Sequence, residues 1–262
     1  MRFLLLSLAL LLAACAPTSQ YNVRDARPPY PAPDLSQLTD TEALGLRLYY
    51  HDRAAWIATD ELTSRGANLN EVAGYLSFDQ DDGSILVRFA GPCNVNICSK
   101  IDVSIFNGRV VGYEKTDEPL PADHLAAWRA RHSALNSGFR ACSQHYNTIV
   151  LPWQHENSPA YRVYLLAASQ EPDEIVMGGH HRFLASNDGK TLIENEPLSM
   201  SCMTMQISED VVAPMTTHVL HEEPLETHVF TSLDHHIPLY VGTSKGVFKV
   251  DGASISLLEL GD

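Results

Sequence analysis

The chain has 262 residues, of which 45% are hydrophobic, and it contains 15 glycines and 15 prolines. This composition is typical of a folded globular protein, and the length suits one large domain or two small ones. The formal net charge of -14 leaves no basic surplus to neutralise phosphate groups. We therefore expect neither nucleic acid nor anionic lipid headgroups as partners.

Residues 1–14 have the pattern of an export signal. Arg2 precedes an apolar run over residues 3–12, which is too short to span a bilayer. Small residues then lead directly to a cysteine in Leu12-Ala13-Ala14-Cys15. This segment resembles the lipobox of bacterial lipoproteins, in which the cysteine becomes the lipid-bearing N-terminus of the mature protein. The alternative is an ordinary secretory signal with an incidental cysteine.

The resemblance implies a modification and a location. A diacylglyceryl group on the Cys15 thiol and an acyl chain such as palmitate on its amine would together anchor the protein stably. Ala16 follows the cysteine and is compatible with the outer membrane in families that sort lipoproteins by this position. We expect a lipid-anchored envelope protein, at the outer membrane and facing the periplasm.

The rest of the chain divides into a linker and a body. Residues 15–36 join the lipid-bearing Cys15 to a proline-rich segment, which we interpret as an extended spacer. Residues 37–262 form the globular body, with a subdivision near residues 115–145 left open.

The first half of the body predicts helices and hairpins. A helix is expected over about 40–64, with an N-cap offered by Thr39-Asp40-Thr41-Glu42, and another over about 121–136. Alternating segments 75–78 and 85–89 flank an acidic turn, and segments 101–106 and 109–113 flank Asn107-Gly108, a favoured type I′ pair. Trp56 and Trp128 are interpreted as core anchors of the two helices.

The second half predicts strands almost throughout. Candidate strands recur at about ten-residue spacing with turn signals between them. They lie at residues 148–151, 161–167, 175–177, 181–185, 192–193, 203–207, 217–220, 227–233, 239–242 and 247–250. The predicted fold class is therefore α+β, with an N-terminal helix and hairpins followed by a β-rich half with a mainly antiparallel sheet.

Four cysteines remain if Cys15 carries lipid. An even number in an exported chain indicates disulfides, and four cysteines allow three connectivities. We predict Cys93–Cys98, which closes a tight loop, and Cys142–Cys202, which closes a loop of about 60 residues. A metal site is the weaker interpretation, because Cys-x4-Cys is not the usual ligand spacing.

The histidines are the unusual feature of the body, since seven of the 12 fall between residues 180 and 236. A zinc or copper site could use His180, His218, His221 and His228, with Glu222 as an oxygen ligand. Alternation along strands argues against it, because His218 and His221 would point to opposite faces. We therefore favour no metal or cofactor, and predict that no three imidazoles converge and that most are partly exposed.

No catalytic motif is identified, which leaves enzymatic activity open but disfavoured. Gly242-Thr243-Ser244-Lys245-Gly246 fits the serine-hydrolase expression, yet it joins two predicted strands and no histidine follows it. Segments 178–183 and 227–230 are similar to stretches of uncharacterised bacterial exported proteins, which implies no function. The leading hypothesis is an envelope lipoprotein whose soluble domain binds another envelope protein or the cell wall; the alternative is a metal-dependent enzyme or metal-binding protein.

Overall fold

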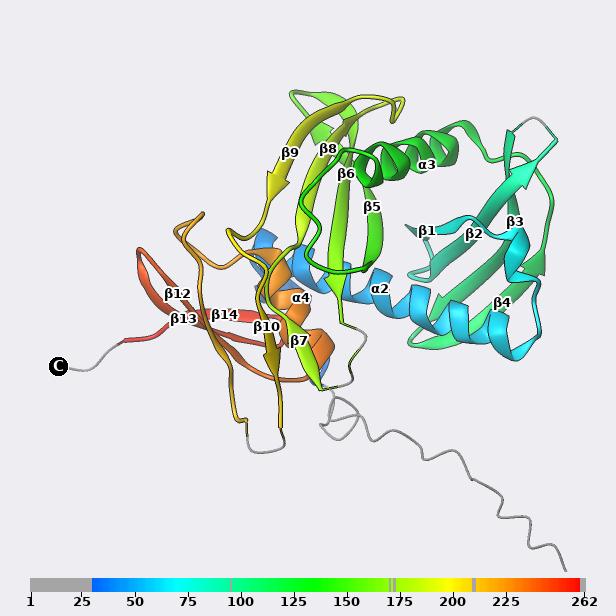
Figure 1. Cartoon of the computed structure of the whole chain (residues 1–262). Helices are drawn as coiled ribbons and strands as arrows, with labels where there is room; N and C mark the ends of the chain where they lie inside the picture. The colour runs from blue at the N-terminus through cyan, green and yellow to red at the C-terminus, as the bar shows by residue number, and fades with distance from the viewer. Residues whose placement is uncertain (1–29, 95, 170, 172, 209–210, 260–262) are drawn as a thin grey trace, which may run out of the picture.

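A computed structural model describes residues 30–94, 96–169, 171, 173–208 and 211–259 (Figure 1). This part of the chain contains three α-helices and fourteen strands, and all but one strand pairing is antiparallel. The predicted α+β class is confirmed, with the N-terminal helix and the β-rich C-terminal half in their expected places. The predicted signal peptide, Cys15 and most of the linker lie outside the described residues.

The long helix α2, Asp40–Ser64, begins and ends close to its predicted limits. Thr39 and Glu42 form a reciprocal capping box: the Glu42 carboxylate accepts from the Thr39 backbone N–H at 2.7 Å, and the Thr39 hydroxyl accepts from the Glu42 N–H. Such a box satisfies two N–H groups that the first helical turn leaves free. Short 3₁₀ turns at Leu35–Gln37 and Leu69–Glu71 flank the helix.

Two four-stranded antiparallel sheets pack beside α2, with a helix between them (Figure 1). The first is a meander of β1 (Gly74–Asp79), β2 (Ile85–Cys93), β3 (Asn96–Phe106) and β4 (Arg109–Lys115). The second has the order β5 (His145–His155), β6 (Ser158–Ala168), β8 (His181–Ser186) and β9 (Leu192–Pro197). Helix α3, Ala122–Leu135, shares one hydrophobic core with β1, β5 and β6.

The C-terminal part adds a third four-stranded sheet and a buried helix. The sheet has the order β11 (Met215–Thr217), β12 (Leu239–Thr243), β13 (Gly246–Asp251) and β14 (Ser254–Leu257), and β11 runs parallel to β12. Strands β7 (Glu174–Val176) and β10 (Thr204–Gln206) form a separate pair. Helix α4, Glu226–His235, lies between this sheet and α2.

Helix α2 connects the three sheets because its different faces enter different cores. Leu46 packs with α4 and the third sheet, Leu48 with β5 and β6, and Leu62 with β2 and β3. Gly45 permits the contact with α4, since an added Cβ would lie 2.5 Å from the Cβ of Val229. Among the described residues, no helix is both long and apolar enough to cross a membrane.

Two of the predicted elements are wrong. Residues 227–233 are helical and belong to α4, and the strand expected at 217–220 ends at Thr217. Nine consecutive residues of α4 are buried, from Glu226 to Asp234, although six of them are polar. Trp128 is buried as predicted, but Trp56 is 48% exposed, with the Arg53 guanidinium over its ring.

Both predicted disulfides are present. Cys93 is bonded to Cys98 and Cys142 to Cys202, with S–S distances of 1.99 and 2.03 Å. The first closes the turn between β2 and β3. The second ties the segment after α3 to the segment that leads into β10.

Candidate functional site

A small cavity lies where α4, β11 and two loops meet. Its volume is about 40 Å³. Because one water molecule needs roughly 10–15 Å³, the cavity holds about three waters or a ligand of that size. The lining combines imidazoles, hydroxyls and a few apolar side chains: Met177, Gly178, His180, Leu198, Ser199, Ser201, Met203, Thr216, Thr217, His218, Thr227, His228 and Thr231.

One wall is positioned by two glycines and a disulfide. A Cβ on Gly178 would lie 2.3 Å from the Ser201 carbonyl oxygen, so only glycine permits this approach. Gly179 has φ +86° and packs against Cys142, whose disulfide partner Cys202 directly follows Ser201. The disulfide therefore fixes the loop that contains Ser199 and Ser201 against the turn that carries His180.

Backbone hydrogen bonds determine the protonation of two imidazoles. The Nδ1 atom of His180 accepts from the Ala167 backbone N–H at 3.0 Å, and the Nδ1 atom of His228 accepts from the Leu225 N–H at 2.9 Å. A backbone N–H is always a donor, so both Nδ1 atoms are unprotonated. In each neutral ring, the Nε2 atom therefore carries the proton.

His218 completes a group of three imidazoles at the cavity. Its ring lies 5.0 Å from that of His228, edge to face, and 5.3 Å from that of His221, in a stack. The Nε2 atoms of His180 and His218 are buried and have no hydrogen-bond partner among the described residues. Buried polar groups of this kind are uncommon and mark places where a ligand or water is needed.

Burial keeps these rings neutral. It lowers the pKa of His228 to about 3, with further lowering by the neighbouring His218 and His180. Burial also lowers the pKa of His180 to about 4, with His181 adding to the effect. The Val176 carbonyl near the ring opposes the shift, but it lies outside hydrogen-bond geometry with Nε2. The pKa of His218 is lowered for the same reason, with His221 adding to the effect. Near neutral pH the cavity is therefore polar but uncharged.

A charged network lies beside the cavity, and none of its residues belongs to the lining. The Nε2 atom of His221 lies 3.2 Å from a carboxylate oxygen of Glu196, which also pairs with Arg182. Arg182 donates to the buried Glu226 at 2.5 Å, and the Tyr164 hydroxyl donates to the same carboxylate oxygen at 2.7 Å. These pairs fix the start of α4, which carries His228 two residues further on.

The structure brings only part of the predicted metal set together. His180, His218 and His228 line one cavity, and His221 stacks on the His218 ring. Glu222 instead lies at the surface beside Lys245, 3.3 Å from its ammonium group. In the described ranges, no three His, Cys, Asp or Glu side chains are arranged to hold a metal ion.

Two expectations about the histidines are wrong. Four of the seven between 180 and 236 are buried, namely His180, His181, His218 and His228. The prediction that most of them are partly exposed is therefore wrong. The rings of His218 and His221 do not point to opposite faces, because β11 ends before them and they lie in a turn region. His180 likewise lies in a loop, where strand alternation does not apply.

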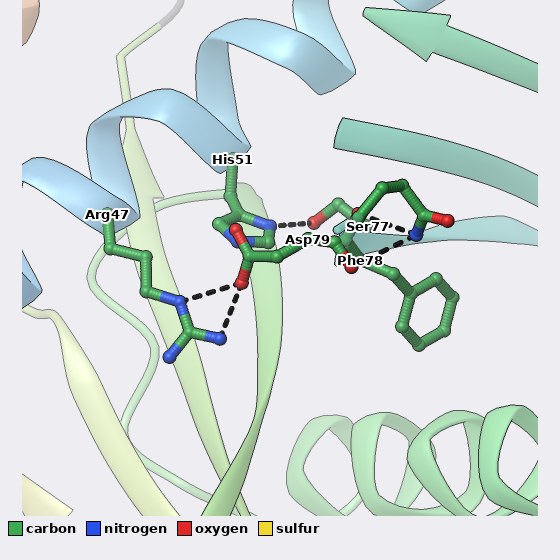
Figure 2. Close-up of polar contacts among 6 residues, drawn as sticks. Arg47, His51, Ser77, Phe78 and Asp79 are labelled. Carbon is green, nitrogen blue, oxygen red and sulfur yellow. Dashed lines mark hydrogen bonds and ion pairs between the residues drawn. The ribbon is translucent and has the colours of Figure 1, made fainter. Parts of the chain in front are cut away.

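A second polar array joins α2 to β1 (Figure 2). His51 lies with its Nδ1 atom 2.8 Å from the Ser77 hydroxyl and its Nε2 atom 3.2 Å from Asp79, which also accepts from Arg47. Two regular spacings place these groups: Arg47 and His51 share a helix face, and Ser77 and Asp79 share a strand face. Sequence reasoning missed this array, although the two spacings could have indicated it.

The array has the residue types of a catalytic triad, but its serine is buried and its aspartate is exposed. Ser77 is 2% exposed, whereas the Asp79 side chain is 49% exposed. A serine nucleophile must face its substrate, with the histidine and carboxylate behind it. Here the order is inverted, so we interpret the array as a structural contact between helix and sheet.

This contact predicts a pH-dependent contribution to stability. The hydrogen bond from His51, together with the Arg47 charge, holds the pKa of Asp79 well below its usual range, against the effect of burial. The stabilisation is therefore full above the ordinary aspartate pKa of about 4 and is lost as the pH falls below it. Asp79→Asn should lower the free energy of unfolding by about 1 kcal/mol at pH 7, because water screens this half-exposed pair.

Urea unfolding at pH 7 and pH 3 measures the effect. The difference between wild type and Asp79→Asn should shrink at the lower pH. Asp81→Asn, an exposed residue of the following turn, is the matched control and should change little. An equal loss at both pH values would contradict the assignment.

Comparison with known proteins adds no relative to this description. No family model, no curated protein and no solved structure matches the chain. The class of protein is therefore defined by the fold itself: an α+β protein with two disulfides and a buried histidine cavity.

Proposed function

We propose that this chain is a lipid-anchored lipoprotein of the bacterial envelope whose folded body is a binding module. The observation that carries the location is Leu12-Ala13-Ala14-Cys15 at the end of a short apolar run. The two disulfides support export, because such bonds persist in oxidising compartments. The proposed position is the outer membrane, with the body facing the periplasm and meeting an envelope protein or the cell wall.

Binding is favoured over metal-dependent catalysis by the protonation of two rings in the cavity. His180 and His228 present Nε2–H groups, because their Nδ1 lone pairs are occupied by backbone N–H donors. A general base or a zinc ligand needs a lone pair that faces the reacting centre. A metal ligand also donates its other ring N–H to a partner, the reverse of what these two rings do. The metal-dependent alternative therefore has weaker support.

The anchoring proposal predicts the effect of Cys15→Ser. Without the thiol there is no site for the diacylglyceryl group, and the protein should move from the membrane fraction to the soluble envelope fraction. Cell fractionation with detection of the full chain measures this. The double variant Cys93→Ser/Cys98→Ser is the matched control, since it loses cysteines but keeps the anchor and should stay with membranes. Identical fractionation of wild type and Cys15→Ser would refute the proposal.

A further inference from the structure

We infer that the histidine cavity binds a small carboxylate-type oxyanion of about the size of formate. This inference deepens the proposed binding function by naming a ligand class for the cavity. It rests on the described body alone and does not depend on the lipid anchor.

The first argument is the set of donors. Two rings have Nε2–H groups fixed by backbone bonds to their Nδ1 atoms, and the Nε2 atom of His180 has no partner among the described residues. His180 and His228 are 5% and 7% exposed, so both rings are largely removed from bulk water. A buried N–H donor without an acceptor, such as that of His180, is costly, and an oxygen atom supplied by a ligand would satisfy it.

The second argument is the absence of competing charge in the lining. None of the residues that line the cavity is Asp, Glu, Lys or Arg. Glu196, the carboxylate that contacts His221, is held by Arg182. An entering anion would therefore meet donors and no carboxylate in the wall, and hydrogen bonds to a charged acceptor are roughly twice as strong as neutral ones.

The third argument is size and access. A cavity of about 40 Å³ admits a ligand of a few non-hydrogen atoms and excludes nucleotides and sugars. Ser201 and Thr217 are exposed members of the lining, so the cavity reaches the surface on their side. Formate offers two acceptor oxygens in this volume, which matches two imidazole donors.

Titration of sodium formate into the full-length, 15N-labelled chain near pH 7, followed by amide NMR, tests the inference. The Ala167 and Leu225 amides should report binding, because each donates to the ring whose opposite nitrogen contacts the ligand. We expect a saturable shift, with a dissociation constant no tighter than about 1 mM for so small a ligand. Formamide, which is neutral and of equal size, should bind at least about threefold more weakly.

Asparagine substitutions separate binding from folding. In His228→Asn the side-chain oxygen can still accept from the Leu225 N–H, while the donor to the cavity is lost; His180→Asn does the same for Ala167. Each variant should weaken formate binding by about tenfold. His145→Asn, at an exposed position at the start of β5, is the control and should bind as wild type does.

Four outcomes would overturn the inference. They are the absence of a saturable shift in wild type, equal binding of formamide, unchanged formate binding in both folded asparagine variants, and displacement of formate by stoichiometric zinc. The lipid anchor is measured separately on Cys15. Failure of the formate experiment is therefore distinguishable from failure of the anchoring proposal.

Discussion

Removal of the Cys142–Cys202 bond is expected to lower the free energy of unfolding by about 4 kcal/mol, from the entropy of the loop it closes in the unfolded chain. The two cysteines are 60 residues apart in sequence. The bond also holds the loop that contains Ser199 and Ser201 beside Gly179. Its removal should therefore loosen this wall of the histidine cavity. Urea unfolding of Cys142→Ser/Cys202→Ser measures the change.

The other disulfide provides the matched control. Cys93 and Cys98 are five residues apart, and the same model gives about 2 kcal/mol for so short a loop. Cys93→Ser/Cys98→Ser should therefore destabilise the protein less, with no effect on formate binding. A larger loss from the short loop than from the long one would contradict the loop-entropy account.

The free energy of unfolding is expected to fall as the pH is lowered below 6.5, where the carboxylates are still ionised. The pKa of His228 is about 3 and that of His180 about 4 in the folded protein, against an ordinary value of 6.5. Because the folded pKa values are lowered, the unfolded chain binds more protons below pH 6.5. The stabilisation is full above that pH and falls by up to about 1.4 kcal/mol per pH unit for each histidine.

Chemical unfolding at a series of pH values between 7 and 4 measures this slope. His180→Asn and His228→Asn should each make the slope shallower, because asparagine does not titrate. His145→Asn, at its exposed position, should leave the slope unchanged. A free energy of unfolding that is flat from pH 6.5 to 4 would contradict the burial of neutral rings. The Asp79 contribution falls in a lower window, below about pH 4, so the two effects are separable.

Local patterns were enough to predict the first half of the body. The Thr39 capping box defines the start of α2, and Asn107 and Gly108 both adopt the positive φ values that a type I′ turn requires. These elements depend on residues a few positions apart, so their information lies within a short window of sequence.

The segment of α4 could not be assigned in that way. Thr227, Val229 and Phe230 have side chains typical of strands, and they are buried along with their neighbours. The helix is stabilised by tertiary contacts: Val229 packs on Gly45 of α2, and Glu226 is held by Arg182 and Tyr164. Such contacts join residues far apart in sequence and override local propensity.

The candidate cavity also depends on contacts between residues far apart in sequence. Its histidines were recognised as a group in the sequence. However, His180 lies in a loop, and His228 lies in helix α4, where the sequence predicted a strand. Their convergence depends on the close approach of Gly178 to Ser201 and on the bond between Cys142 and Cys202. The residue types were therefore visible in the sequence, whereas their common position and their tautomers required the fold.

The positions of two protons test the account of this cavity most directly. Long-range 15N–1H correlation of the histidine side chains distinguishes a protonated Nε2 from a protonated Nδ1 at neutral pH. For His180 and His228, the backbone bonds from Ala167 and Leu225 predict protonated Nε2 and unprotonated Nδ1. Protonated Nδ1 in both rings would contradict the account, because the Nε2 lone pairs would then face the cavity and a metal site would become the better interpretation.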